Sequence, residues 1–223
     1  MSDYNTYPEP NVLSRAQEMD NYFLNTWTEI KPDAVNQVME AHPISAAIKQ
    51  AGCHESKVGG EFITQRIKIG KGVLIEPGAF IKSPTIIGDG TEVRHGAYIR
   101  GNCLIGRNCV VGHVTEVKHT VFLDGAKAGH FAYLGDSILG NLVNLGAGTK
   151  LANLRFIKGN ISITTPGSIV QTGLRKLGAI LGDGVQTGCN SVTSPGTLLG
   201  KKSMVIPNTT VVSGYHPDSS LIR

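Results

Sequence analysis

The stretch 87-IGDGTEVRHGAYIRGNCLIGRNCVVGHVTEVKHTVFL-123 places an aliphatic residue at every sixth position. The series begins at Ile69, and a small residue stands two places before each later member. Its members are Ile69, Ile75, Ile81, Ile87, Val93, Ile99, Ile105, Val111, Val117 and Leu123. A period of six is neither the 3.6 of an α-helix nor the 2 of one strand, so it indicates short strands joined by tight turns.

Three of these hexads predict one coil of a repeating structure. An aliphatic residue followed by glycine recurs at Ile69, Ile87 and Ile105, which are eighteen residues apart. This spacing is typical of the hexapeptide class of parallel β-helix, in which the aliphatic side chains point into a three-sided core. Each strand would pair with the strand one coil further on, at a spacing of about 4.8 Å. The sequence therefore predicts an all-β fold, a parallel β-helix.

The period defines three segments of the chain. We expect the β-helix over 59–216, with a short tail at 217–223. After Leu123 the phase slips, and residues 155–176 break it, so they predict an excursion loop that a hairpin would fit. Residues 1–58 show helical periodicity in "SRAQEMDNYFLNTW" and "PDAVNQVMEAH", which predicts an α-helical N-terminal cap or arm.

The composition of the chain argues against nucleic acid and membranes as partners. The formal net charge is +4, aromatic residues are 6% of the chain, and no dense basic run occurs, which argues against nucleic acid. No apolar run reaches the roughly 18 residues of a membrane helix, and the N-terminus lacks the apolar core of a signal peptide. The four cysteines show no CxxC spacing. We therefore expect a cytoplasmic protein with reduced thiols and no membrane partner.

Two motifs carry a family resemblance. "KAGHFAYLGD" at 127–136 and "VNLGAGT" at 143–149 resemble the C-terminal acetyltransferase domain of the bifunctional N-acetylglucosamine-1-phosphate uridyltransferase/glucosamine-1-phosphate acetyltransferase. The broader similarity covers roughly residues 65–215. It implies left-handed winding and a homotrimer with active sites between neighbouring prisms. It also implies acetyl-CoA as donor and an amino sugar phosphate, such as glucosamine 1-phosphate or a related nucleotide sugar, as acceptor.

The resemblance implies a role for each matching residue. His130 would be the general base that takes a proton from the sugar amine as it attacks the acetyl thioester, work that suits a near-neutral imidazole. Cationic side chains would bind the phosphate and polar ones the sugar, while two further residues would face coenzyme A. These are Arg100 and Lys118 for the phosphate, Tyr133, Asn144 and Asn153 for the sugar, Lys176 as a further basic acceptor residue, and Ala147 and Cys189 for coenzyme A.

Departures from the family pattern leave a second reading open. Leu154 and Arg155 stand where the family has Tyr and Asp, the excursion is inserted, and the basic C-terminal arm is missing. We expect no uridyltransferase activity, because residues 1–55 are too few for that domain. The alternative is a non-catalytic β-helix that oligomerises or binds a ligand.

Zinc is a weaker alternative. It would use His95, His113, His119 and His130, but the His-x4-His pair of zinc-binding β-helices is absent. We therefore predict no metal site.

Overall fold

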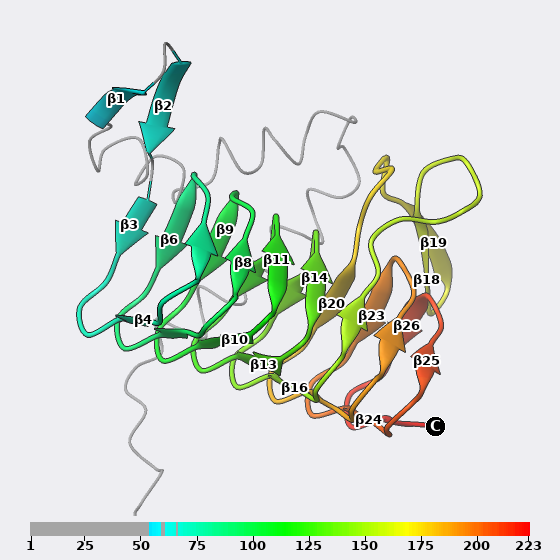
Figure 1. The fold of residues 1–223 in the computed structure, drawn as a ribbon. Helices are drawn as coiled ribbons and strands as arrows, with labels where there is room; N and C mark the ends of the chain where they lie inside the picture. Colours follow the sequence, from blue (N-terminus) through cyan, green and yellow to red (C-terminus); the bar gives the residue numbers. More distant parts are fainter. Residues whose placement is uncertain (1–53, 59–60, 66) are drawn as a thin grey trace, which may run out of the picture.

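The structure is a computed structural model that describes residues 54–58, 61–65 and 67–223, and most of these residues form one long coil (Figure 1). The chain visits three parallel sheets in turn, one strand per sheet in each turn, and winds in the left-handed sense. No helix in these ranges is long and apolar enough to cross a membrane. The predicted helices at 14–27 and 32–42 lie outside the described residues.

The three sheets share one construction, in which each strand pairs with strands one turn away. The first sheet holds β3 (Ile67–Ile69), β6 (Thr85–Ile87), β9 (Cys103–Ile105), β12 (Val121–Phe122), β15 (Ile138–Leu139), β20 (Ala179–Leu181), β23 (Thr197–Leu199) and β26 (Gly214–His216). The second sheet holds β4 (Leu74–Ile75), β7 (Glu92–Val93), β10 (Val110–His113), β13 (Lys127–His130), β16 (Asn144–Leu145), β21 (Gln186–Thr187), β24 (Met204–Val205) and β27 (Leu221–Ile222). The third sheet holds β5 (Phe80–Ile81), β8 (Tyr98–Ile99), β11 (Glu116–Lys118), β14 (Tyr133–Gly135), β17 (Lys150–Leu151), β22 (Val192–Thr193) and β25 (Thr210–Val211).

The period-six residues from Ile87 to Val117 form the core, which confirms the parallel β-helix, whereas Ile69 and Ile75 in the first described turn are exposed. Ile87 pairs with Ile105 eighteen residues later, and both are almost fully buried. The small residue two places before each aliphatic one also points inward, as Thr91 and Ala97 do. Burial of these stacked aliphatic side chains is the main stabilising contribution of the coil.

The phase slips one hexad earlier than the sequence indicates. Phe122, not Leu123, pairs with Ile105, and its ring is fully buried whereas Leu123 is partly exposed. Three apolar residues in a row at 121–123 allow either Phe122 or Leu123 to point inward, so the period alone could not choose between the two registers. The side of the coil between Val117 and Phe122 therefore has five residues instead of six.

Three segments at the margins complete the fold. Residues 155–176 leave the coil, and within them β18 (Ser162–Thr165) and β19 (Ser168–Gln171) form an antiparallel hairpin. A second hairpin, β1 (His54–Val58) with β2 (Glu61–Gln65), crosses the expected boundary at 58, so the last five residues of the expected helical segment form a strand. The expected tail 217–223 contains β27, which extends the second sheet.

Candidate functional site

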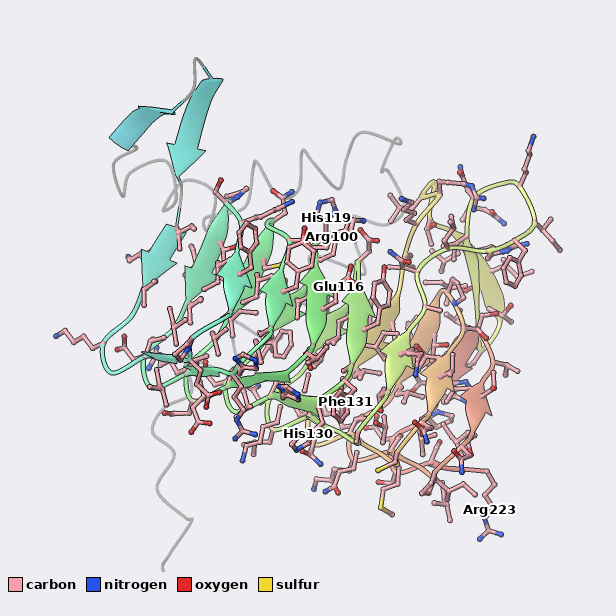
Figure 2. The ribbon with its side chains drawn as sticks, viewed as in Figure 1. Arg100, Glu116, His119, His130, Phe131 and Arg223 are labelled. Carbon is pink, nitrogen blue, oxygen red and sulfur yellow. The ribbon has the colours of Figure 1, made fainter. Side chains whose placement is uncertain are left out.

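Two long edges of the prism border the third sheet. At one edge the chain turns from the second sheet to the third; we call it the His130 corner, and it holds His95, His113, His130, Ala147 and Cys189. At the other edge the chain turns from the third sheet to the first; we call it the Asp136 corner, and it holds Asn102, His119, Asp136 and Asn153. Figure 2 shows His130 and Phe131 along one edge and Arg100, Glu116 and His119 along the other.

A buried carboxylate organises the Asp136 corner. Asp136 Oδ1 lies 3.1 Å from His119 Nδ1, and Asp136 Oδ2 lies 3.3 Å from Lys118 Nζ. Asn153 Nδ2 also donates to Oδ2, and the Tyr133 hydroxyl donates to Asn153 Oδ1 at 3.4 Å. The side chain of Asp136 is only 10% exposed, so these partners replace the water that it has lost.

The network fixes the charges at this corner. Burial alone would raise the pKa of Asp136, but hydrogen bonds from His119 and Asn153 and the charge of Lys118 outweigh it and lower that pKa. Burial and the negative charges of Glu116 and Asp136 raise the pKa of Tyr133, so its hydroxyl stays protonated and acts as a donor. The corner therefore presents to a ligand the neutral hydroxyl of Tyr133 and the ammonium group of Lys118, which is paired with Asp136.

Two shortened sides of the coil bring these residues into line. The sides from Val117 to Phe122 and from Leu134 to Leu139 have five residues each, and at both the backbone turns through a left-handed residue. Those residues are His119 and Asp136, with φ of 47° and 48°. Because the two turns match, the imidazole and the carboxylate stack one rung apart.

The outer face of the third sheet carries a charged pair beside the corner. Arg100 Nη1 lies 2.6 Å from Glu116 Oε1, and both side chains are more than a third exposed. The Arg100 guanidinium also lies 5.9 Å from the centre of the Tyr98 ring. Such a pair is easily opened by a competing anion, because exposed ion pairs contribute little.

The His130 corner joins the predicted base to the predicted coenzyme A residues. His130 is exposed at the end of β13, and its carbonyl accepts a hydrogen bond from Gly148 N at 3.0 Å. The carbonyl of Ala147 in turn accepts from Asn190 N at 2.8 Å. His130, Ala147 and Cys189 therefore occupy successive rungs of one column, and Cys189 is an exposed free thiol.

The other histidines of this corner are held by the backbone. His95 and His113 stack with ring centroids 5.7 Å apart, and their Nδ1 atoms face carbonyl oxygens of the preceding rung at 2.6 and 2.9 Å. No group of three or more potential ligands that could hold a metal ion occurs within the described part of the chain.

The residues predicted from the resemblance divide between the two edges. Lys118, Tyr133 and Asn153 meet at the Asp136 corner, and Lys176 lies opposite Leu154 at the base of the excursion. Asn144 is exposed on the second sheet, in register with Lys127. The third sheet separates the edges by about five residues, or roughly 16 Å at 3.3 Å per residue. One chain alone therefore does not bring His130 to the cations that are predicted to bind the phosphate.

Sequence reasoning missed Asn102, Asp136 and Glu116, and it considered His119 only as a possible zinc ligand. A signal was present, because Asn102, His119, Asp136 and Asn153 recur at intervals of seventeen. Asn102 Nδ2 lies 2.9 Å from His119 Nε2, so one hydrogen-bonded chain runs through all four residues. A search for the period of eighteen passes over this series.

Comparisons with known proteins agree with the fold and the motifs. A bifunctional sugar-1-phosphate nucleotidylyltransferase/acetyltransferase of Sulfurisphaera tokodaii is 41% identical over 96 residues, which is 43% of this chain and 24% of that protein. The bifunctional protein GlmU of Methanococcus maripaludis is 38% identical over 109 residues, 49% of this chain and 26% of its own length. The chain thus spans about a quarter of the length of these curated relatives.

Solved structures are more distant. A hexapeptide transferase family protein from Anaplasma phagocytophilum is 16% identical with a TM-score of 0.44, and 71% of this chain and 76% of that one are covered. AntD, an N-acyltransferase from Bacillus cereus in complex with dTDP and coenzyme A, is 21% identical with a TM-score of 0.32, and 69% and 77% are covered.

These findings define the class of the protein. It is a hexapeptide-repeat β-helix related to the C-terminal domain of bifunctional sugar nucleotidyltransferase-acetyltransferases. More narrowly, the chain belongs to the family described as the GMPPB C-terminal domain, which matches residues 81–218, more than half of its length.

Proposed function

We propose that the protein is a coenzyme A-dependent N-acyltransferase that acetylates an amino sugar phosphate, such as glucosamine 1-phosphate, with His130 as general base. The observation that supports this proposal most directly is that the candidate residues lie along two edges of the prism. One edge aligns His130 with Ala147 and Cys189, and the other gathers Lys118, Tyr133 and Asn153 around Asp136. The first edge suits a thioester and a proton acceptor, and the second suits a phosphorylated sugar.

The chemistry needs no covalent enzyme intermediate. The neutral imidazole of His130 takes a proton from the sugar amine as its nitrogen attacks the thioester carbonyl. The carbon–sulfur bond then breaks, the new amide forms, and the coenzyme A thiolate leaves and is protonated. Arg100 and Lys118 would hold the phosphate once it displaces their carboxylate partners, since charge-assisted bonds to phosphate are strong.

A second copy of the chain completes the site in this proposal. The two edges lie on opposite sides of the third sheet in one prism, so the His130 corner of one copy must face the Asp136 corner of its neighbour. Phe131, next to His130, is 55% exposed in the single chain, which supports a contact there. A closed ring of three prisms satisfies this head-to-tail contact.

The test is thiol release from acetyl-CoA in the presence of glucosamine 1-phosphate. We expect release by the wild type and its loss in His130→Ala with the trimer unchanged. His113→Ala is the matched control, because His113 lies one rung away on the same corner and has no proposed role. Equal activity of both variants would refute the assignment of the base.

A second candidate is a non-catalytic ligand-binding module. It is favoured by the His130 ring, for which no hydrogen bond is present among the described residues, whereas a general base is commonly oriented by a third group. A trimer that binds glucosamine 1-phosphate by calorimetry but binds no coenzyme A would select this candidate.

A further inference from the structure

The excursion concentrates uncompensated positive charge. From Ser137 to Gly182 the sequence contains five cationic residues and no acidic residue. Lys150 lies on β17, and the other four, Arg155, Lys158, Arg175 and Lys176, lie in the excursion. None of the ion pairs found in the described part of the chain involves them. Like charges repel one another, and these cations are in none of the ion pairs found there. They are therefore available to bind an anion.

Two of these cations are held side by side. Leu154 and Lys176 form an isolated antiparallel bridge, and Arg155 and Arg175 are the next residues of the two bridged segments. Arg175 Nη2 donates to the Arg155 carbonyl at 3.2 Å, and Arg155 Nη1 donates to the Asn160 carbonyl at 3.4 Å. Both guanidinium groups are therefore positioned, with further donors free.

The base of the excursion is anchored rather than loose. Ile161, Ile163, Leu174 and Leu177 are buried in a small apolar cluster of their own, packed against Ile180 and Leu198 of the first sheet. Ile161 N donates to the Leu174 carbonyl at 2.7 Å. An arginine pair on such a base loses little freedom when it binds an anion.

The pair lies on the acceptor side of the proposed site. Leu177 N donates to the Asn153 carbonyl at 3.0 Å, so Arg155 and Arg175 are each two residues from this contact. Asn153 is two rungs beyond the level of Lys118, about 10 Å along the prism axis. Ala147 and Cys189, the predicted coenzyme A residues, lie on the opposite edge.

The residue after Arg155 is an aromatic side chain in solvent. Phe156 is fully exposed, and the neighbouring Ile157 is 71% exposed. An exposed phenyl ring one residue along the chain from a guanidinium group suits a flat base joined to a phosphate chain, because aromatic rings stack on every base.

We propose that Arg155 and Arg175 bind the diphosphate of a nucleotide-linked amino sugar and that Phe156 stacks on its base. This proposal rests on the proposed function, because it names the acceptor class for the same site. It assigns Arg155 and Arg175 to the nucleotide end of the diphosphate. Arg100, Lys118 and the Asp136 corner keep the sugar and the phosphate that is joined to it.

The experiment compares four probes by calorimetry at low ionic strength: UDP, inorganic pyrophosphate, glucosamine 1-phosphate and coenzyme A. We expect Arg155→Gln/Arg175→Gln to weaken UDP and pyrophosphate at least tenfold and to leave glucosamine 1-phosphate within threefold. Phe156→Ala should weaken UDP about fivefold and leave pyrophosphate unchanged. The matched control is Lys201→Gln/Lys202→Gln, which removes two cations from an exposed turn between β23 and β24. A circular-dichroism melt verifies that each variant is folded.

Each outcome decides the proposal. UDP and pyrophosphate affinities unchanged in the double arginine variant would overturn the diphosphate site, and a UDP affinity unchanged in Phe156→Ala would overturn the stacking. If the double arginine variant bound only coenzyme A more weakly, Arg155 and Arg175 would belong to the donor site. That result would overturn the proposed class of acceptor. None of these measurements requires acyl transfer. A protein that binds UDP through the arginines but releases no thiol therefore keeps this site and loses the proposed function.

Discussion

Asp136 accepts a hydrogen bond from His119 across one rung of the coil, with 3.1 Å between Oδ1 and Nδ1. A carboxylate only accepts, so Nδ1 carries the proton, and in the neutral ring Nε2 then accepts from Asn102 Nδ2 at 2.9 Å. Both polar atoms of the imidazole are thereby satisfied within the prism. This arrangement marks His119 as a structural histidine, in contrast to the exposed His130.

Asp136 makes stability depend on pH. Its pKa in the folded chain is below the ordinary 3.8, so the carboxylate stabilises the fold above that value and loses this contribution as pH falls through the folded pKa. Asp136→Asn should reduce the free energy of unfolding by about 3 kcal/mol at pH 7. It should also flatten the loss of stability below pH 4, measured by denaturant titrations. Asp89→Asn is the control at an exposed position; its amide oxygen can still accept from Lys71 N, so the free energy of unfolding at pH 7 should be unchanged.

Phe131 should contribute to the seam between copies. It has a φ of 52°, a conformation that disfavours large side chains, and it is 55% exposed. Phe131→Asn, in which the new side chain tolerates this backbone, should raise the concentration at which the proposed trimer dissociates at least tenfold in sedimentation experiments.

Leu142→Asn is the matched control for Phe131→Asn. Leu142 has a φ of 58° and is 54% exposed, but it lies at the corner between the first and second sheets. Equal weakening by both variants would contradict a seam at the His130 corner.

Two inward threonines should respond in opposite directions to the same change. Thr193 Oγ1 is the one buried side-chain polar atom without a hydrogen-bond partner in the range 67–223. Thr187 Oγ1 accepts from Gly146 N at 3.1 Å and lies 2.8 Å from Thr149 Oγ1. Thr193→Val should raise the free energy of unfolding by about 1 kcal/mol, and Thr187→Val should lower it by about 1–2 kcal/mol. Thermal and urea unfolding would distinguish them, and a loss in both would refute this account.

The position of the phase slip is also testable. Phe122 is fully buried and Leu123 is partly exposed. Phe122→Ala should destabilise the coil by about 3–5 kcal/mol, a typical value for a buried aromatic ring, whereas Leu123→Ala should cost less than about 1.5 kcal/mol. Urea unfolding of both variants measures the difference. The reverse order would restore the uninterrupted period-six series.

The period-six pattern predicts the coil because every inward position obeys it, from Ile87 to Val111. The pattern fails at Phe122, because adjacent apolar residues at 121–123 allow two registers and only the packing of the preceding rung selects one. The candidate site is less predictable. Its chemistry-bearing residues follow from the family resemblance. The seventeen-residue spacing of His119 and Asp136 is visible in the sequence, but it gains a meaning only when the coil shows that seventeen residues make one turn there.

A side of five residues removes one position from the outer surface while its inward residues, Val117 and Phe122, remain in the core. Loss of a single codon at such a corner therefore removes one exterior residue and leaves the interior filled. In a solenoid, a deletion can change which polar side chains lie along an edge. It requires neither the insertion of a loop nor a substitution in the hydrophobic core.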